Sequence, residues 1–465
     1  MQNAPAPATN RTTSPWAWIP TLYFAEGIPY VMVMTVSVVM YKRLGISNTD
    51  IALYTSWLYL PWVIKPLWSP IVDLLGTKRL WIVLTQGVIA VVLAMVALSI
   101  PAPRFFQYTL AFLWLMAFSS ATHDIAADGF YMIGLKQHQQ AAFVGVRSTF
   151  YRIAMIAGEG AIVVLAGTLE TRFDQVHTAW QITLFVVASV FLAAFVYHLF
   201  ILPKPAGDAW RGRENRQSLT GEFFKVFADF FKKDGIIVII AFLLLFRFAE
   251  AQLVKLAYPF LLDAASEGGL GLNTSQVGVI KGTFGVLALL AGGILGGLVI
   301  SQHGLRRWLW PMVFMMNVPN LVYVYLAYAQ PSSQLLIGAA VTVEQFGYGF
   351  GFTAYMLYMI MVSEGKHKTA HFAICTGFMA LSMMLPGMFS GWLQEWLGYQ
   401  HFFLWVMIAT VPGFIVAALV KIDSRFGTKR AEDDEPAVYC RRCGFNLTGT
   451  AGGVCSECGM PIARG

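Results

Sequence analysis

The sequence is built from a series of long apolar stretches, separated by short polar segments. A helical stretch of about 20 apolar residues is long enough to cross the hydrocarbon core of a bilayer. Backbone groups in lipid must satisfy their own hydrogen bonds, and these runs are too long and too uniformly apolar for the strands of a membrane barrel. The pattern therefore predicts twelve membrane-spanning helices, at 16–41, 50–73, 80–100, 106–134, 146–168, 178–201, 236–263, 275–300, 308–329, 333–362, 368–393 and 399–421.

The composition agrees with a membrane protein and excludes an ordinary soluble one. Hydrophobic residues make up 57% of the chain and charged residues only 12%, whereas about 25% of the residues of a soluble domain are charged. So few charges cannot cover a water-facing surface of this size. The polar start before the first span has neither a basic segment nor a small-residue cleavage site, so we expect no cleaved signal peptide.

The basic residues are distributed unevenly between alternate loops. The net charge is +7, and up to Arg430 nineteen Lys and Arg residues fall in one set of connecting and terminal segments. The other set holds only four: Lys42, Arg43, Arg104 and Arg172. Cytoplasmic loops carry the excess of Lys and Arg, so this bias predicts cytoplasmic termini in a bacterial inner membrane. The positive charge thus reports topology, and we expect no nucleic-acid partner.

The second half of the chain repeats the first. Three segments recur in order, at nearly constant offsets: 24–26 at 248–250, 44–51 at 270–277, and 76–79 at 304–307. Parallel repeats of six helices are the plan of major facilitator transporters, whose binding site lies at mid-membrane between the halves. We therefore expect an all-α fold of two six-helix bundles, with these parts: a cytoplasmic start (1–15), a first bundle (16–201), a cytoplasmic linker (202–235), a second bundle (236–421) and a cytoplasmic tail (422–465).

The fourth expected span carries three polar residues, His123, Asp124 and Asp128. A charge inside a span costs about 2.5–3.5 kcal/mol on insertion scales, so a charged residue there indicates a functional role or a compensating partner. Asp124 and Asp128 are four residues apart and share one helix face. Removal from water favours a protonated carboxyl group, which suits a proton-coupled carrier. The alternative is a structural pairing with Lys or Arg on a neighbouring helix.

Glu26 lies in the middle of the first span, beside Gly27 and Pro29. Proline cannot donate the helical hydrogen bond, so we expect a kink that frees backbone polar groups next to a buried acid. Such an arrangement favours a binding site.

Further acids lie at mid-depth in the second half. Glu250 is the repeat partner of Glu26 and lies near Arg247 and Lys255, while Glu344 lies in the tenth span. Glu250 and Arg247 are three residues apart and could simply neutralise each other. Both a site and a structural role remain open for these residues.

Lys65, in the second span, is surrounded by prolines and by Trp57, Tyr59, Trp62 and Trp68. A cation among aromatic rings suits a ligand that is both anionic and sugar-like. The alternative, which we favour for the aromatic residues, is an interfacial belt and packing.

Arg152 and Glu159, in the fifth span, are seven residues apart on one helix face. They could pair with each other or with the fourth span.

The end of the second span forms a different group, Asp73, Gly76, Lys78 and Arg79. An acid, a turn glycine and two basic residues at the cytoplasmic edge resemble the gating motif of major facilitator proteins. The second copy has Ser301 where Asp73 stands.

Four of the five cysteines crowd into the tail, as Cys440, Cys443, Cys455 and Cys458. Two C-x2-C pairs separated by eleven residues suit a tetrahedral zinc ion, and four protein ligands make such a site structural. A redox dithiol or unused thiols are the alternatives. We expect a small zinc-ribbon-like module that offers a surface to a cytoplasmic partner. Cys375, inside a span, is expected to be a small buried hydrophobic residue.

Four segments of the first half together resemble the AmpG-type permeases, which are major facilitator proteins related to the acetyl-CoA transporters. They are 23–29, 65–73, 120–128 and 151–152. The resemblance implies import of anhydro-muropeptides from the periplasm, driven by the proton gradient. It assigns matching roles to Lys65, Asp73, Asp124, Asp128 and Arg152. The sequence departs from the family at His123, where an amide commonly stands, and in its cysteine-containing tail.

The leading hypothesis is therefore a proton-driven importer of a sugar-containing cell-wall fragment, whose partners are this small molecule, protons and the bilayer. A carrier of another anionic solute, such as a CoA ester or an oligosaccharide, is the alternative within transport. A transport-inactive sensor or scaffold is the alternative outside it, although a scaffold has no use for acids at mid-membrane. The sequence has no nucleophile–base motif, so we expect no enzymatic activity and no cofactor for transport.

Overall fold

The computed structural model of the chain describes residues 13–135, 137–205, 208, 225–364, 367–423 and 426. The predicted zinc ligands Cys440, Cys443, Cys455 and Cys458 lie outside the described residues. All regular structure in the described part is helical.

The first half consists of helices joined by short turns, with two π-helical segments inserted. Its elements are α1 (Pro15–Val31), η1 (Met32–Val36), α2 (Ser37–Arg43), α3 (Asn48–Trp57), α4 (Leu60–Leu74), α5 (Lys78–Ser99), α6 (Phe105–Gly134), α7 (Gln137–Ile156), η2 (Ala157–Ile162), α8 (Val163–Phe173) and α9 (Val176–Ile201).

The second half follows the same scheme. Its elements are α11 (Ile236–Leu245), α12 (Phe248–Leu262), η4 (Ala265–Glu267), α13 (Thr274–Val277), η5 (Gly278–Gly285), α14 (Val286–His303), α15 (Leu305–Asn317), η6 (Val318–Asn320), α16 (Leu321–Ala329), α17 (Gln334–Ser363), α18 (Lys368–Ile408) and α19 (Val411–Leu419).

Twelve membrane crossings follow from these helices, as the sequence predicts. Ten helical segments of the described chain are long and apolar enough to cross a membrane. The last of them contains two spans, because Gly398 has a φ of +71° and interrupts α18. The remaining span is α3 with α4. It is broken after Trp57 because Pro61 cannot donate to the carbonyl four residues earlier and its ring clashes with that carbonyl.

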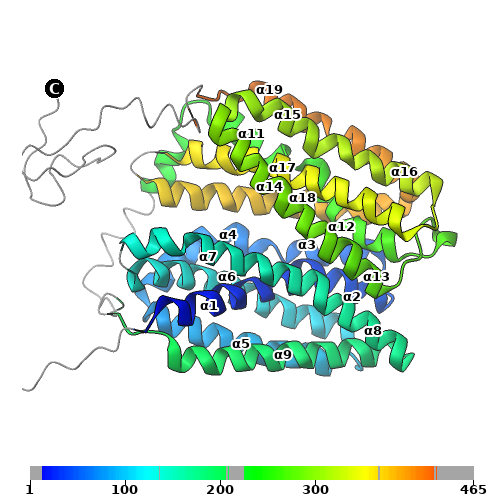
Figure 1. Cartoon of the computed structure of the whole chain (residues 1–465), viewed down its shortest axis with the longest axis horizontal. Coiled ribbons are helices and arrows are strands. Elements are labelled where there is room, and N and C mark those ends of the chain that lie inside the picture. Colours follow the sequence, from blue (N-terminus) through cyan, green and yellow to red (C-terminus); the bar gives the residue numbers. More distant parts are fainter. Residues whose placement is uncertain are drawn as a thin grey trace, which may run out of the picture.

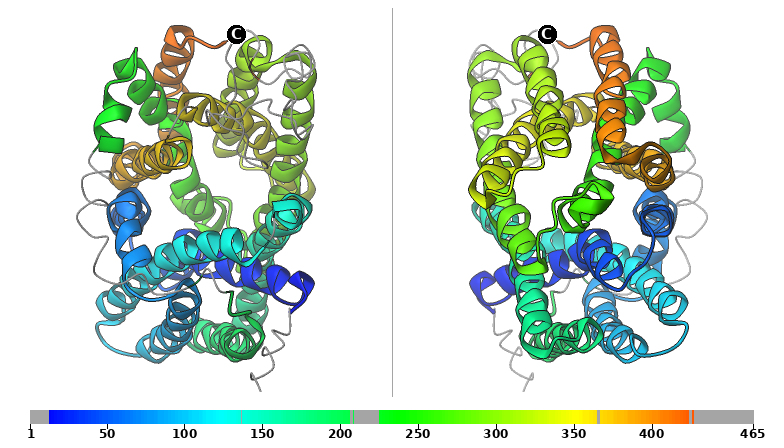
Figure 2. Two further views of the ribbon diagram at one scale, coloured as in Figure 1. Left: turned by 90° about the vertical axis from the view of Figure 1, so that its left-hand side faces the viewer. Right: turned by 90° about the vertical axis from the view of Figure 1, so that its right-hand side faces the viewer.

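The two halves form separate bundles that lie face to face. In Figure 1 the helices of the first half occupy the lower part of the view and those of the second half the upper part. Figure 2 shows the same division from both ends of the molecule. One apolar core lies within the first half and another within the second, while the largest core contains buried residues from both.

The repeat predicted from sequence has equivalent local geometry in both halves. Gly45 and Gly271 both have positive φ, at +82° and +65°, which a residue without a Cβ adopts at no steric cost. Two residues further on, the side chains of Ser47 and Asn273 each cap the next helix by accepting a hydrogen bond from a backbone N–H three residues later. We call the end of the molecule that carries these two turns the closed end, and the opposite end, with Lys78 and Lys368, the linker end.

At the closed end, polar side chains tie the two halves together. The ammonium of Lys42 lies 2.6 Å from a carboxylate oxygen of Asp263. The amide of Asn48 donates to Gln394 at 2.6 Å and to the hydroxyl of Tyr399 at 2.9 Å. Asn48 follows the capping residue of α3, so the repeated turn places it at the boundary between the halves.

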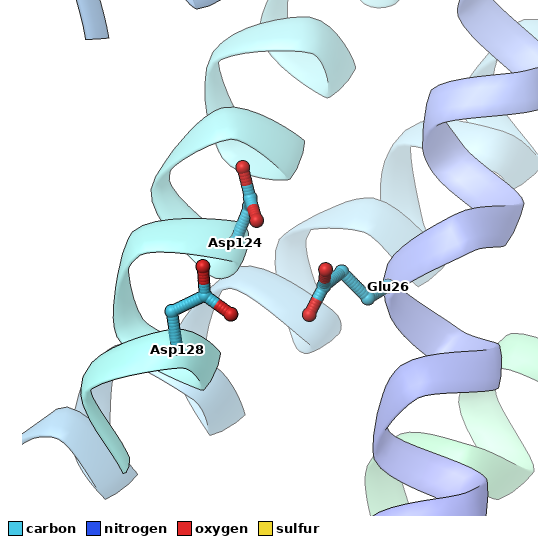
Figure 3. Close-up of side chains that lie close together, drawn as sticks. All are labelled: Glu26, Asp124 and Asp128. Atoms are coloured by element: carbon cyan, nitrogen blue, oxygen red, sulfur yellow. The ribbon is translucent and has the colours of Figure 1, made fainter. Parts of the chain in front are cut away.

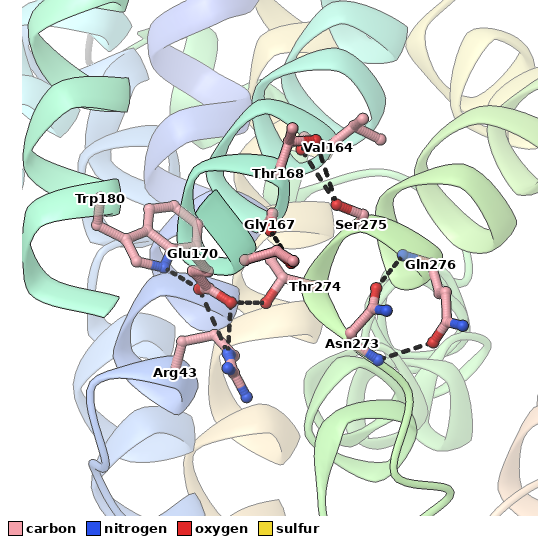
Figure 4. A network of polar contacts seen from close by, with 11 residues as sticks. Arg43, Val164, Gly167, Thr168, Glu170, Trp180, Asn273, Thr274, Ser275 and Gln276 are labelled. Carbon is pink, nitrogen blue, oxygen red and sulfur yellow. Dashed lines mark hydrogen bonds and ion pairs between the residues drawn. The ribbon is translucent and has the colours of Figure 1, made fainter. Parts of the chain in front are cut away.

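A second polar group at the closed end uses the other copy of the turn (Figure 4). The hydroxyl of Thr274, in the second half, donates to Glu170 of the first half at 2.6 Å. Glu170 also accepts from Trp180 at 2.8 Å and pairs with Arg43 at 3.1 Å. Among the described residues, the hydrogen bonds and ion pairs between the halves gather at this end and at mid-depth.

At mid-depth the halves meet through small residues on the π-helical segments η2 and η5. A Cβ added at Gly282 would lie 1.8 Å from the carbonyl oxygen of Glu159, and one added at Gly160 would lie 2.6 Å from the hydroxyl of Thr283. Only glycine therefore permits this backbone contact. Segments of this π-helical kind are frequent at functional sites.

This contact predicts that Gly282→Ala is destabilising, because its Cβ would overlap a backbone atom that cannot rotate away. Overpacking of this kind costs about 1–3 kcal/mol. The thermal unfolding midpoint of the purified protein in detergent should fall clearly below that of the wild type. Gly297→Ala is the matched control, since a Cβ there meets no heavy atom within 4 Å. An unchanged midpoint for Gly282→Ala would contradict the close contact.

Candidate functional site

The predicted acids of the first half meet in space. Glu26 on α1 and Asp124 and Asp128 on α6 point toward one another, and one oxygen of each lies within 4.8 Å of the others (Figure 3). Asp124 and Asp128 share a helix face because they are four residues apart. The three carboxylates form what we call the acidic cluster.

Two cations neutralise two of these carboxylates. Lys65, on α4, donates from its ammonium to Asp124. Arg147, on α7, lies 2.6 Å from Asp128, and its guanidinium also lies 4.6 Å from the ring centre of Tyr23. The structural pairing considered from sequence is therefore present for both aspartates, and a binding role is compatible with it.

Glu26 is the carboxylate of the cluster left without a cationic partner. Its side chain is 6% exposed, and among the described residues its Oε2 has no hydrogen-bond partner. Three carboxylates and two cations leave one negative charge uncompensated if all are ionised. A buried charge without a partner is strongly unfavourable, so this position calls for a proton or another cation.

Solvent reaches part of this cluster. The side chains of Lys65 and Asp124 are each 23% exposed, and that of Asp128 is 37% exposed. Lys65, Asp124 and Asp128 are therefore not completely removed from solvent in this conformation.

Arg147 was missed by the sequence argument, which chose Arg152 instead. Both lie on α7, but Arg147 meets Asp128 while the side chain of Arg152 is exposed. A pairing of Arg152 with Glu159, one of the two alternatives considered from sequence, is not present. The carboxylate of Glu159 instead accepts from Tyr258 of the second half at 2.8 Å and from Thr35 at 3.2 Å. Which arginine faces the acids depends on helix rotation, which the spacing of the two does not reveal.

His123, which the sequence assigns to the proton or substrate site, contacts Gln86 and is not one of the three carboxylates of the acidic cluster. It is fully buried and its Nε2 lies 2.9 Å from the amide nitrogen of Gln86. The other end of that amide contacts His198 at 2.9 Å, and His198 contacts Thr21 at 2.9 Å. This chain joins α6, α5, α9 and α1. Only one ring nitrogen of His123 is bonded in this way, because among the described residues its Nδ1 has no hydrogen-bond partner.

A second buried group occupies the second half. Arg247 donates to the hydroxyl of Tyr348, and its guanidinium lies 4.8 Å from the ring centre of Phe352. Glu250 forms no direct ion pair with Arg247, although the two charges lie close enough to interact electrostatically. Among the described residues, neither oxygen of Glu250 has a hydrogen-bond partner, although the residue is buried.

Glu344 lies in the same group and is bound by neighbouring polar residues. It accepts from Gln345 at 3.0 Å and from Tyr323 at 3.4 Å. The ammonium of Lys281 lies 3.4 Å from the same tyrosine hydroxyl and 5.4 Å from the ring centre of Tyr258. Lys281 was not predicted from sequence, although a lysine among glycines inside a predicted span was a usable signal.

The aromatic residues near Lys65 pack against other rings. Trp62 meets Tyr30 edge to face at 5.3 Å, and Trp68 lies 5.6 Å from Phe118. Both contacts agree with the packing role that we favoured for these residues.

The expected gating segment forms the tight turn before α5. Gly76 has a φ of +96°. The backbone N–H groups of Lys78 and Arg79 donate to the carboxylate of Asp208, at 2.6 and 3.0 Å. An acid at a helix start is favourable because the first N–H groups have no partner within the helix. The side chain of Asp73 lies outside what the structure describes.

The paired bundles, the closed end and the buried charges between the halves define a transporter of the alternating-access kind. Residues 21–359 match the Major Facilitator Superfamily, and the chain belongs to that family.

Two named bacterial proteins are similar in sequence to this chain. The chain is 27% identical over 410 residues to a Rickettsia conorii protein named as a transporter, AmpG 4, covering 85% of this chain and 94% of that protein. It is 24% identical over 402 residues to the anhydromuropeptide permease of Escherichia coli (strain K12), covering 85% of this chain and 77% of that one.

Solved structures share the fold. The nucleoside transporter NupG matches with a TM-score of 0.64 at 16% identity, covering 87% of this chain and 98% of that chain. A bacterial homologue of the human lysosomal transporter Spinster, in an inward-facing and unoccupied conformation, matches with a TM-score of 0.64 at 15% identity, covering 89% and 96%. The twelve-helix fold expected from sequence is thereby confirmed.

Proposed function

We propose that this protein imports anhydro-muropeptides, or closely related sugar-peptide fragments of the cell wall, and that the proton gradient drives this import. The observation that carries the proposal is the acidic cluster, with one uncompensated carboxylate, in a transporter whose relatives include an anhydromuropeptide permease. Glu26 takes up the proton, and the cations around it orient the anionic groups of the solute.

The direction of transport rests on the charge of the loops. Up to Arg430, nineteen basic residues fall in the set of segments that includes Lys78 and Lys368, and four fall in the set that includes Lys42 and Arg43. The linker end therefore faces the cytoplasm. The closed end then faces the periplasm, and the conformation is inward-facing, with the acidic cluster open to the cytoplasm.

The coupling follows from the burial of Glu26. With the periplasmic side open, the carboxyl group takes a proton, which removes the uncompensated charge and permits the halves to close around it. After the change to the inward-facing state, solvent reaches Asp124 and Asp128 and the proton leaves to the cytoplasm. A solute bound between the halves is carried with it.

Uptake into membrane vesicles tests the function directly. Vesicles containing the protein should accumulate a labelled N-acetylglucosaminyl-anhydro-N-acetylmuramyl peptide when the outside is acidic, and accumulation should collapse when a protonophore is added. Vesicles without the protein provide the control. No accumulation by a well-expressed protein would refute this substrate class, and accumulation that ignores the protonophore would refute proton coupling.

Replacing Glu26 separates coupling from binding. Glu26→Gln keeps the size of the side chain and removes its charge, so exchange of labelled for unlabelled solute at equal pH should continue. Accumulation driven by a pH gradient should fall to the level of the protonophore-treated wild type. Glu267→Gln, which changes an exposed glutamate of η4 at the closed end, is the control. Normal gradient-driven accumulation by Glu26→Gln would move the proton site elsewhere.

The tail is proposed to hold one structural zinc ion through Cys440, Cys443, Cys455 and Cys458. Thiols stay reduced in the cytoplasm, and four cysteines with this spacing bind zinc as thiolates. Metal analysis of the purified protein should find one zinc per chain, lost in Cys440→Ser/Cys443→Ser. A protein truncated after residue 430 should still transport. Zinc below stoichiometry under reducing conditions would contradict the site.

A further inference from the structure

A third polar group lies between the halves, nearer the closed end than the acidic cluster. It consists of Lys255 on α12, Thr55 and Ser56 on α3, and Tyr59 in the break between α3 and α4. Lys255, Thr55 and Ser56 take part in neither of the two groups described above.

Lys255 is a buried lysine without an acidic partner. Its side chain is 3% exposed, and its ammonium donates to the hydroxyl of Thr55 at 2.9 Å and lies 5.2 Å from the ring centre of Tyr59. Within the described part of the chain no carboxylate forms an ion pair with it. An ammonium has three donors, and a neutral hydroxyl and a ring are weak compensation for the loss of water.

Ser56 supplies an independent sign of a missing ligand. The residue is 0% exposed, and among the described residues its hydroxyl has no hydrogen-bond partner. A buried polar group of this kind is rare unless a ligand or water completes it.

Lys255 and Ser56 converge on the same place in α18. A Cβ added at Gly387 would lie 2.6 Å from the hydroxyl oxygen of Ser56, and 3.3 and 3.6 Å from two side-chain carbons of Lys255. Because Gly387 has no side chain, the backbone of α18 packs directly against both the unsatisfied hydroxyl of Ser56 and the side chain of Lys255.

These contacts cross the boundary between the bundles. Thr55 and Ser56 belong to the first half, and Lys255 belongs to the second. When the halves separate at the closed end, the bond from Lys255 to Thr55 must break, and the ammonium then faces the path that opens there.

We propose that Lys255, with the hydroxyls of Thr55 and Ser56, is a carboxylate-binding subsite for the transported solute. The subsite is exposed when the periplasmic side is open and is covered in the inward-facing state. An ammonium with hydroxyl donors is suited to a carboxylate, which forms strong charge-assisted hydrogen bonds. On closure the hydroxyl of Thr55 replaces the carboxylate on Lys255, which releases the solute toward the cytoplasmic side.

This inference rests on the proposed function, since it assigns a peptide carboxylate of the solute to a particular residue. The proposed contact of Lys255 with the solute lies in the second half, whereas the acidic cluster and its cations lie in the first half. A sugar-peptide has carboxylates that can be masked as amides without changing its size, so the two interactions can be separated experimentally.

The test compares two forms of the labelled anhydro-muropeptide, one with free peptide carboxylates and one with these groups amidated. Loss of a hydrogen bond to a charged group corresponds to about a tenfold or larger change in affinity. Lys255→Gln should raise the KM for the free acid by about that factor and change the KM for the amide by about twofold at most. Lys255→Arg should retain most of the preference for the acid. Lys368→Gln, an exposed lysine at the linker end, is the control for charge alone.

Retained uptake of the amidated form shows that Lys255→Gln is folded. An equal rise in KM for both forms, or no rise for either, would overturn the subsite. If the wild type takes up neither form, the proposed substrate class fails, and the subsite is then tested without transport. N-acetyl-alanine should raise the thermal midpoint of the purified wild type more than N-acetyl-alanine amide does, and Lys255→Gln should lose this difference. Equal stabilisation of the wild type by both compounds would also overturn the proposal.

Discussion

Charge removed from water is stable in this molecule only where another group compensates it, and the arrangement of the helices follows that requirement. Lys65 and Arg147 neutralise two carboxylates of the first half, and Lys42 meets Asp263 between the halves. In a low-dielectric interior each such pair offsets a large cost of desolvation. Among the described residues, compensation is incomplete at Glu26, Glu250 and Lys255, and at such positions a mobile proton or a solute has a physical reason to bind.

The same requirement links the acidic cluster to the conformation. At the closed end, polar groups of both halves satisfy one another around Asn48 and Glu170, so no solvent is needed there. Toward the linker end, Asp124 and Asp128 retain access to solvent. When the closed end opens, the bonds that Asn48 and Lys255 make across the boundary are lost. Polar groups at the closed end then need solvent or a solute as partners. A transporter of this class has two such arrangements, and the structure describes one of them.

Much of the fold was predictable because it depends on patterns that are local in sequence. Apolar length identified the spans, and the repeated turn at residues 44–51 and 270–277 identified the two halves. The backbone conformation of the glycines and the hydrogen bonds of the capping residues depend only on residues nearby in sequence. Their geometry is therefore the same in both copies of the turn. The interruption after Trp57 is likewise explained by Pro61 alone.

The candidate site was predictable only in part. Asp124 and Asp128 were found because a spacing of four residues places them on one face, and Glu26 because an acid inside a span requires a reason. Their partners were not found. Arg147 and Arg152 are equally plausible by distance along the chain, yet only the first reaches an acid.

The sequence by itself determined the number of helices, their pairing into two repeated halves and the identity of the buried acids. Hydrophobic length, period and local turn chemistry encode these properties. Only the tertiary structure decided which charges meet, that His123 joins Gln86 instead of the acids, and that Glu26 and Lys255 remain uncompensated. The reason is geometric: each residue turns a helix by about 100°, so the partner of a buried side chain depends on the rotation and tilt of several helices at once.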